Sequence, residues 1–351
     1  MVQGDNSMRA WSVTKWISKL SDLTMVTSHA NPAPPAAGEV LVRVKAAGAN
    51  FFDGLMVQGK YQIRPPLPFI PGAEFAGVIE AVGDGVDGLA VGQRVFGGNV
   101  LGCYADRVTV PSAATLAIPD SLSFSDACGI YLTYPTAYAG LTLRGGLKAG
   151  ETCLVHAAAG GVGSCAVQLA KALGATVIAT AGSDEKLQVA KRAGADVLIN
   201  YRDEAWPEAV REATGGRGVD VVFDPVGLIV ESTKCIAWNG RIVVVGFTKG
   251  DIPKIPANRI LLKNIAVTGL HWGAYAYSEP EQVPKVWSAV LDLLSKGTVK
   301  PILYDQLYPL ERLPDALHAI ENRSSFGKVV IDVDLPDDER DRFVAGSSAK
   351  L

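Results

Sequence analysis

The sequence predicts an α/β protein of two domains, one strand-rich and β-barrel-like, the other a doubly wound parallel sheet. The chain has 351 residues, more than a single hydrophobic core usually organises. Before Glu151, short strand patterns follow one another between Gly- and Pro-containing turns, which is typical of a compact β domain. From about Glu151 onward, apolar strands alternate with helical stretches, which is typical of a parallel sheet covered by helices.

The strands of the first domain are predicted from period-two alternation that ends in turn residues. Val40–Ala46 alternates between inward and outward side chains, and Glu74–Val82 runs into the turn Gly83-Asp84-Gly85. Gly92–Phe96 and Tyr104–Val110 are two further short strands.

The second domain is predicted as a regular succession of strands and helices. Its strands are Thr152–His156, Thr176–Thr180, Val197–Asn200, Val219–Phe223 and Ile242–Gly246. Its helices are Gly163–Leu173, Asp184–Ala193 and Glu204–Thr214. Beyond about residue 275 the pattern is mixed, with a helix at Val283–Lys296 and a strand at Lys328–Val333.

Composition excludes several classes of protein. With 48% hydrophobic and 20% charged residues the chain is globular, and its net charge of -3 makes nucleic acid a poor partner. Five cysteines without a CxxC pair favour a reducing compartment over a disulfide framework. No long apolar run reads as a membrane span.

A glycine-rich loop is the strongest local signal. Ala158-Ala159-Gly160-Gly161-Val162-Gly163 follows an apolar strand and opens a helix, and Ala158 replaces the first glycine of the usual fingerprint. Small residues let the backbone turn sharply and approach a pyrophosphate, which the N–H groups of the helix N-terminus then bind. We therefore predict a dinucleotide site at Ala159, Gly160, Gly161, Val162 and Gly163. The alternative is a tight turn that binds nothing.

The end of the next strand favours NADPH over NADH. An NAD site places an acid there for the ribose hydroxyl, but this strand ends in Ala181-Gly182-Ser183 and Asp184 comes late. Ser183, Lys186, Tyr201 and Arg202 offer instead the hydroxyls and cations that suit a 2′-phosphate. The alternative is that Lys186 is an ordinary solvated lysine.

Several motifs between residues 8 and 333 carry a family resemblance. They are Gly48-Ala49-Asn50-Phe51-Phe52-Asp53, Pro71-Gly72-Ala73-Glu74-Phe75-Ala76-Gly77, Thr136-Ala137-Tyr138, the glycine-rich loop with His156 and Ala157, Ala179-Thr180-Ala181-Gly182-Ser183 and Gly327-Lys328-Val329-Val330. In order and spacing they resemble the zinc-independent quinone oxidoreductase branch of the medium-chain dehydrogenase/reductase family, including the zeta-crystallin type.

The resemblance implies a GroES-like catalytic domain built from both chain ends, with a Rossmann domain between them. We accordingly predict residues 8–132 as the first part of the catalytic domain, 133–270 as the NADPH-binding domain and 271–335 as the return. Residues 1–7 and 336–351 are predicted as flexible tails. The last three residues, Ala-Lys-Leu, resemble a peroxisomal address, so we expect a peroxisomal protein if the source is eukaryotic and a cytoplasmic one otherwise.

The same resemblance implies a site without a metal. Zinc-dependent relatives carry a cysteine in the first motif, Gly-His-Glu in the second and a cluster of four cysteines. This chain has Asn50 and Gly72-Ala73-Glu74 at those places and no such cluster, so too few zinc ligands stand together. Cys103 is interpreted as a buried apolar residue.

Three residues are implied as catalytic. Asn50 would lie near the nicotinamide and the substrate oxygen as a hydrogen-bond donor, and Asp53 would order its loop; an ordinary polar turn is the alternative. Tyr61 would be a proton donor or a wall of the substrate pocket, or simply a rim aromatic. Leu55 departs from the family, whose quinone reductases often have tyrosine there.

Further residues are implied at the cofactor. Thr136 matches a threonine near the nicotinamide, and Lys328 matches a lysine near the cofactor or caps the final strand. Val226, Gly246 and Phe247 follow strand ends, where ligands bind in parallel sheets. Other residues have an open role: His271, Trp272, Tyr275 and Tyr277 as pocket or subunit contact, and His156 as a core histidine.

The predicted activity is metal-free hydride transfer from NADPH to a quinone or another conjugated carbonyl compound, by a homodimer. A quinone or enone is already electrophilic, so positioning and some stabilisation of the oxyanion are enough. The alternative on the same scaffold is a 2-enoyl-thioester or alkenal reductase. A non-catalytic NADPH-binding or RNA-binding role is the third hypothesis, which the lack of a basic stripe opposes.

Overall fold

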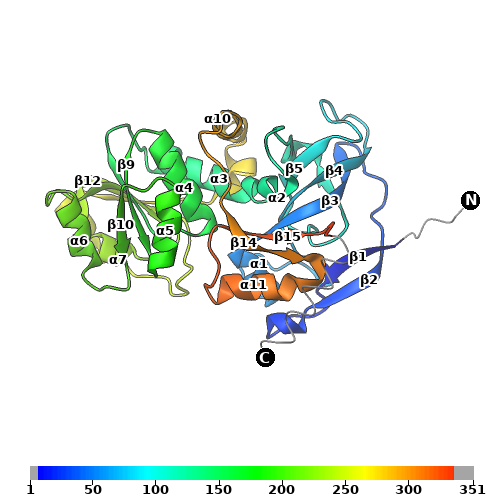
Figure 1. Ribbon diagram of the computed structural model, residues 1–351, viewed down its shortest axis with the longest axis horizontal. Helices are drawn as coiled ribbons and strands as arrows, with labels where there is room; N and C mark the ends of the chain where they lie inside the picture. Colours follow the sequence, from blue (N-terminus) through cyan, green and yellow to red (C-terminus); the bar gives the residue numbers. More distant parts are fainter. Residues whose placement is uncertain (1–6, 336–351) are drawn as a thin grey trace, which may run out of the picture. The chain divides into compact units, whose positions relative to one another are not determined.

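Two stretches far apart in the sequence build the first of two compact units. The computed structural model describes residues 7–335, of which 7–132 and 303–335 form the first unit and 133–302 the second (Figure 1). The α/β class, with a strand-rich domain and a parallel-sheet domain, is as predicted. Ser7, which we expected in a tail, begins the first strand. The segment 336–351 lies outside the described residues, so the targeting role of its last residues stays a prediction.

The first unit holds two sheets. The smaller one pairs β1 (Ser7–Ser12) with β2 (Thr24–Ala30), and the larger has the order β14-β15-β3-β4-β5-β7, with β6 paired to β3. The larger sheet's strands are β3 (Glu39–Ala49), β4 (Glu74–Val82), β5 (Arg94–Gly98), β6 (Arg107–Pro111), β7 (Thr115–Ala117), β14 (Leu303–Pro309) and β15 (Lys328–Asp332). Its helices are α1 (Phe51–Val57), α2 (Phe124–Ala127) and α11 (Leu313–Glu321).

The predicted alternation of β3 is confirmed by burial. Val40, Val42 and Val44 are fully buried in the core of the first unit, whereas Arg43 between them is exposed. Burial of each valine stabilises the fold by ~1.5–3 kcal/mol. The predicted strand Glu74–Val82 agrees with β4 at both ends.

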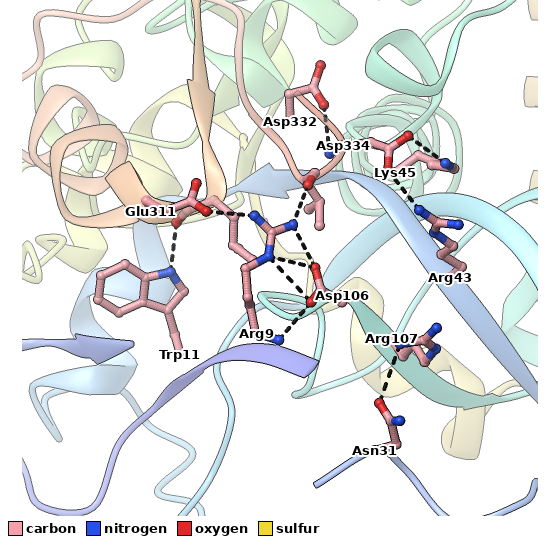
Figure 2. A network of polar contacts seen from close by, with 12 residues as sticks. Arg9, Trp11, Asn31, Arg43, Lys45, Asp106, Arg107, Glu311, Asp332 and Asp334 are labelled. Carbon is pink, nitrogen blue, oxygen red and sulfur yellow. Dashed lines mark hydrogen bonds and ion pairs between the residues drawn. The ribbon is translucent and has the colours of Figure 1, made fainter. Parts of the chain in front are cut away.

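Arg9 on β1 forms ion pairs and hydrogen bonds with residues of the second stretch of the first unit, 303–335. Its guanidinium pairs with Asp106 at 2.7 Å and Glu311 at 2.6 Å, and it also donates to the carbonyl of Val333 at 2.8 Å. Figure 2 shows Arg9 between these partners, with the Trp11 indole donating to the carbonyl of Leu310 nearby. The contacts with Glu311 and Val333 join residues more than 300 positions apart, so they tie β1 to the second stretch of the first unit.

The second unit is built on a six-stranded sheet in which every neighbouring pair is parallel. Its order is β10-β9-β8-β11-β12-β13, and the strands are β8 (Thr152–Val155), β9 (Thr176–Ala181), β10 (Val197–Asn200), β11 (Val219–Asp224), β12 (Ile236–Val244) and β13 (Ala266–Gly269). The helices are α3 (Ile130–Ala139, beginning in the first unit), α4 (Gly161–Ala172), α5 (Asp184–Arg192), α6 (Trp206–Ala213), α7 (Ile229–Ser232), α8 (Ala257–Lys263), α9 (Tyr275–Ser278) and α10 (Gln282–Ser295). Within residues 7–335, no helix has both the length and the apolar character needed to cross a membrane.

The strand order of this sheet reverses at β8. β9 and β10 follow on one side of β8, and β11, β12 and β13 lie on the other. In doubly wound sheets the ligand binds outside the carboxyl ends of the strands at this reversal. The topology therefore points to the loops that follow β8, β9, β11 and β12.

Two differences from the predicted boundaries have local causes. β12 begins at Ile236, earlier than expected, because a register shift with Asn239 at a φ of 62° lets a bent strand continue. The return to the first unit falls at residue 303 and not at 271. The chain from 271 to 302 stays with the second unit, where the main-chain N–H of Lys300 donates to Gln168 of α4 at 2.8 Å.

His156 is a core histidine, as predicted. It is fully buried, with Nδ1 2.8 Å from the Thr180 hydroxyl and Nε2 2.9 Å from the Ser232 hydroxyl. Ser232 gives its own proton to the carbonyl of Leu228, so Nε2 of His156 must donate and Nδ1 accept. Burial lowers the pKa of His156, which keeps the ring neutral and suits it to joining β8, β9 and α7.

Candidate functional site

The loop after β8 has the geometry of an anion site. Ala157 adopts a left-handed φ of 46°, and Gly160 is the N-cap of α4. A Cβ at Gly163 would lie 2.1 Å from the carbonyl oxygen of Ala157, so only glycine fits there. The first N–H groups of α4, at Gly161–Gly163, have no acceptor within the helix and carry its positive end. A diphosphate fits this backbone, because no large side chain at Ala159, Gly160 or Gly161 stands in its way.

The edge of the sheet at β9 gathers hydroxyl and cationic side chains. The Ser183 hydroxyl caps α5 by accepting from the main-chain N–H of Lys186 at 3.4 Å. A Cβ at Gly182 would lie 3.2 Å from the Tyr201 ring and 3.5 Å from Nε of Arg202, so both side chains pass close over this glycine. Tyr201 and Arg202, two of the residues expected to meet a phosphate, therefore lie beside Gly182, which precedes Ser183 in the chain.

The turns after β11 and β12 are bonded to each other. The carboxylate of Asp224 accepts from the main-chain N–H groups of Val226 at 2.8 Å and Gly227 at 2.9 Å. The hydroxyl of Thr248 donates to the carbonyl of Pro225 at 3.1 Å, which ties the Gly246–Thr248 turn to it. The N–H of Val226 is thus already used, so this residue can meet a ligand only with other atoms. Gly246 and Phe247 are partly exposed in the same turn.

A buried polar network surrounds Asn50 in the first unit. β15 pairs with β3 so that Val330 faces Gly48, and β4 pairs with β3 so that Phe75 faces Ala47. These registers bring Lys328 and Glu74, which each begin a strand, to Asn50 at the end of β3. Lys328 forms an ion pair with Glu74 and donates to Oδ1 of Asn50 at 2.6 Å. Nδ2 of Asn50 donates to Glu74 at 3.0 Å.

Asp53 orders the turn that carries Asn50. Its Oδ2 accepts from the main-chain N–H of Asn50 at 2.8 Å and from the Tyr104 hydroxyl at 2.6 Å. Its Oδ1 is buried without a hydrogen-bond partner. Burial, only partly offset by these hydrogen bonds, raises the pKa of Asp53 to about 6. Burial also raises the pKa of the Tyr104 hydroxyl, which stays a donor.

Tyr61 lies outside this hydrogen-bonded network. Its half-buried ring stacks on Phe52 with centroids 5.3 Å apart. Burial, together with the charge of Asp53, raises the pKa of the Tyr61 hydroxyl and keeps it protonated. Leu55 and Asn50 line a small cavity between α1 and α11, with Leu317 and Ile320 on its far side.

The other predicted residues are placed as follows. Thr136 lies on α3 and is partly exposed. Trp272 and Tyr275 stack with centroids 5.3 Å apart, and Tyr277 is exposed. Cys103 is fully buried, and burial raises the pKa of its thiol. Within residues 7–335, no three His, Cys, Asp or Glu side chains gather as a metal site would require.

Glu74 and Tyr104 belong to the site, although no role was predicted for them from the sequence. Glu74 belongs to a quoted motif, and its charge at the head of an apolar strand is a signal, because a buried carboxylate needs partners. Tyr104 carried no such signal. Its contact with Asp53 spans 51 positions and depends on the packing of the whole unit.

Comparison with known proteins places these features in a family. Residues 36–120 match the alcohol dehydrogenase GroES-like domain and residues 161–296 the zinc-binding dehydrogenase family. The chain is 40% identical to quinone oxidoreductase-like protein 2 homolog of Nematostella vectensis over 84% of this chain and 81% of the relative. The rat protein named quinone oxidoreductase-like protein 2 is 38% identical, over 86% of each chain. The crystal structure of Escherichia coli quinone oxidoreductase complexed with NADPH has a TM-score of 0.84 and 33% identity, covering 92% of this chain and 99% of that one.

Asp53→Asn should change the pH dependence of stability with a defined sign. The pKa of Asp53 is about 6 in the fold and 3.8 ordinarily, so the fold binds more protons than the unfolded chain between these values. The stability from this group is present below about pH 4 and is lost as the pH rises through about 6. The wild type should lose ~2–3 kcal/mol relative to Asp53→Asn between about pH 4 and pH 7, measured by urea unfolding. If the free energy of unfolding changes with pH in the same way for the wild type and for Asp53→Asn, the pKa of the buried Asp53 carboxyl is not raised.

Proposed function

This chain belongs to the quinone oxidoreductase branch of the medium-chain dehydrogenase/reductase family, and from that membership we propose that it reduces quinones with NADPH without a metal. It is an oxidoreductase, as its relatives are. The observation that carries the cofactor assignment is the glycine-rich loop after β8. Its required glycine at Gly163 and the unobstructed start of α4 fit a dinucleotide diphosphate.

NADPH is favoured by the chemistry at the end of β9. This strand ends in Ala181, and no acid follows until Asp184, inside α5. Ser183, Tyr201 and Arg202 come together there, and they suit a 2′-phosphate. The Escherichia coli structure is itself a complex with NADPH. When bound, the coenzyme supplies the hydride, and the protein holds and orients it.

The proposed acceptor is a quinone or a related conjugated carbonyl compound. Phe52 and Leu55 lie on α1, the helix that follows Asn50, and Tyr61 stacks on Phe52. These side chains supply apolar and aromatic surface of the kind an aromatic substrate requires. The proposal of metal-free chemistry is supported by the side chains themselves, because the described residues bring together no three metal-ligating groups. Tyr61 favours the alternative, an enoyl-thioester or alkenal reductase, since its protonated hydroxyl could serve as a proton donor.

A homodimer is the proposed assembly. β13 is an edge strand of the second unit, and Ala266 and Gly269 on it are exposed. Large apolar side chains are exposed nearby on α8 and β12, namely Trp238, Leu261 and Leu262. A second copy would cover both the unpaired edge and the apolar surface.

Charge reversal at Lys186 should weaken NADPH more than NADH. Lys186→Glu places a carboxylate beside the proposed 2′-phosphate, and loss of a charge-assisted contact is worth about 10–100-fold in affinity. We expect the KM for NADPH to rise by that factor while the KM for NADH changes little. Lys191→Glu, on the exposed end of the same helix, is the control and should leave both unchanged. Equal effects on the two coenzymes would contradict a 2′-phosphate site.

A panel of acceptors tests the substrate. Purified protein with NADPH should turn over quinones, with and without EDTA, at a higher kcat/KM than 2-enoyl-CoA thioesters or alkenals. Failure to reduce any quinone would end the proposal, and a far better enoyl thioester would establish the alternative. In that case Tyr61→Phe should lower kcat by about 100-fold, and Tyr304→Phe should not, because proton transfer is typically worth about 10²–10⁴.

The assembly is tested by light scattering after gel filtration. The wild type should have twice the 36.9 kDa mass of the chain. Leu261→Glu with Leu262→Glu should release monomers, because charges would be buried in the interface. Val91→Glu is the control, since Val91 is an exposed apolar residue of the first unit. A monomeric wild type at micromolar concentration would exclude the dimer.

A further inference from the structure

The orientation of the Asn50 carboxamide is fixed by the nature of its partners. An ammonium can only donate and a carboxylate can only accept, so Oδ1 must face Lys328 and Nδ2 must face Glu74. The second hydrogen of Nδ2 goes to the carbonyl of Gly48 at 3.3 Å. The amide is therefore not free to exchange its oxygen and nitrogen.

Both donor hydrogens of Asn50 are used within the protein. An asparagine amide has two N–H donors and two lone pairs on oxygen. Glu74 and Gly48 take the two hydrogens, and Lys328 takes one lone pair. The unused capacity is one lone pair of Oδ1, which can accept a hydrogen bond and cannot stabilise an oxyanion.

The pair that holds Asn50 is enclosed. Glu74 is fully buried and Lys328 is 5% exposed. A Cβ at Gly129 would lie 2.3 Å from Cγ of Lys328, and one at Gly48 would lie 2.7 Å from its Cε, so two glycines make room for the lysine. The second oxygen of Glu74 accepts from the main-chain N–H of Leu132 at 3.0 Å. Each charge is thus compensated, as a buried ion pair requires.

We propose that Asn50 takes part in the reaction as a hydrogen-bond acceptor, and that Glu74 and Lys328 are positioning residues that hold it in that orientation. The group it accepts from is a hydroxyl or N–H of the molecule bound beside Asn50. This inference rests on the proposed function, and it replaces the role of donor to the substrate oxygen that we predicted from the family resemblance.

Exchanging the amide and the carboxylate tests the direction of the hydrogen bond. Asn50→Asp alone sets two carboxylates against one lysine, so its thermal midpoint should fall by several degrees. Asn50→Asp with Glu74→Gln restores one carboxylate and one amide, and it should recover most of that loss. Because the carboxylate introduced at position 50 can only accept, this double variant should have an NADPH-dependent kcat/KM at least tenfold above that of Asn50→Asp alone. A double variant that is stable but no faster than Asn50→Asp alone would show that Asn50 must donate, and would overturn the proposal.

A second variant keeps the test decisive if the exchange does not fold. Glu74→Gln with Lys328→Met removes both charges, which buried pairs often tolerate without loss of stability. If the pair positions Asn50, the thermal midpoint should stay near that of wild type while kcat/KM falls at least tenfold. Unchanged activity would mean that the pair has only a structural role.

A measurement of NADPH binding distinguishes failure of this proposal from failure of the proposed function. NADPH affinity is measured for each variant by quenching of tryptophan fluorescence, which needs no substrate. If the wild type binds NADPH but reduces no quinone, the proposed acceptor fails, and the orientation of Asn50 is still read from the thermal midpoints and affinities. If the wild type reduces no quinone, and Asn50→Asp with Glu74→Gln recovers neither the thermal midpoint nor the NADPH affinity lost in Asn50→Asp, the proposal is overturned as well.

Discussion

The ion pair between Lys328 and Glu74 is the interaction on which the position of the Asn50 amide depends. Two opposite charges removed from water are tolerated only when both are paired and their remaining hydrogen bonds are satisfied. Here the two residues lie 254 positions apart, and strand pairing brings them together. The need to enclose this pair accounts for Gly48 and Gly129, which leave space for the lysine side chain. The pairing of β15 with β3 is what brings Lys328 to this place.

A second polar layer extends from this pair through Asn50 to Asp53 and Tyr104. Asp53 accepts from the backbone of Asn50 and from the Tyr104 hydroxyl, so the start of α1 is held by side chains from two directions. Burial raises the pKa of Asp53 to about 6, and its second oxygen has no partner. Such an arrangement is costly for stability, and costly polar groups persist where a site needs a fixed geometry.

The site of the second unit depends on a different constraint, the close packing of its main chain. Main-chain N–H groups, and not side chains, form this site. Close packing of α4 on β8 leaves no room for a Cβ at Gly163, and the sheet reverses its strand order at this loop. The positions of the N–H groups follow from the helix itself, so few side chains are needed. The choice between NADPH and NADH then depends on the side chains near the end of β9, which are Ser183, Tyr201 and Arg202.

Local patterns in the sequence determined the two-domain α/β class, most strands and helices, the glycine-rich loop and the lack of an acid at the end of β9. These features depend on neighbours within a few residues, so periodicity and turn chemistry express them directly. Tertiary structure alone decided the direction of the Asn50 amide, the partners of Lys328 and the place of Tyr104. It also placed residues 271–302 with the second unit. The reason is that hydrogen-bond direction and burial are set by groups that only folding brings within reach, whatever their separation along the chain.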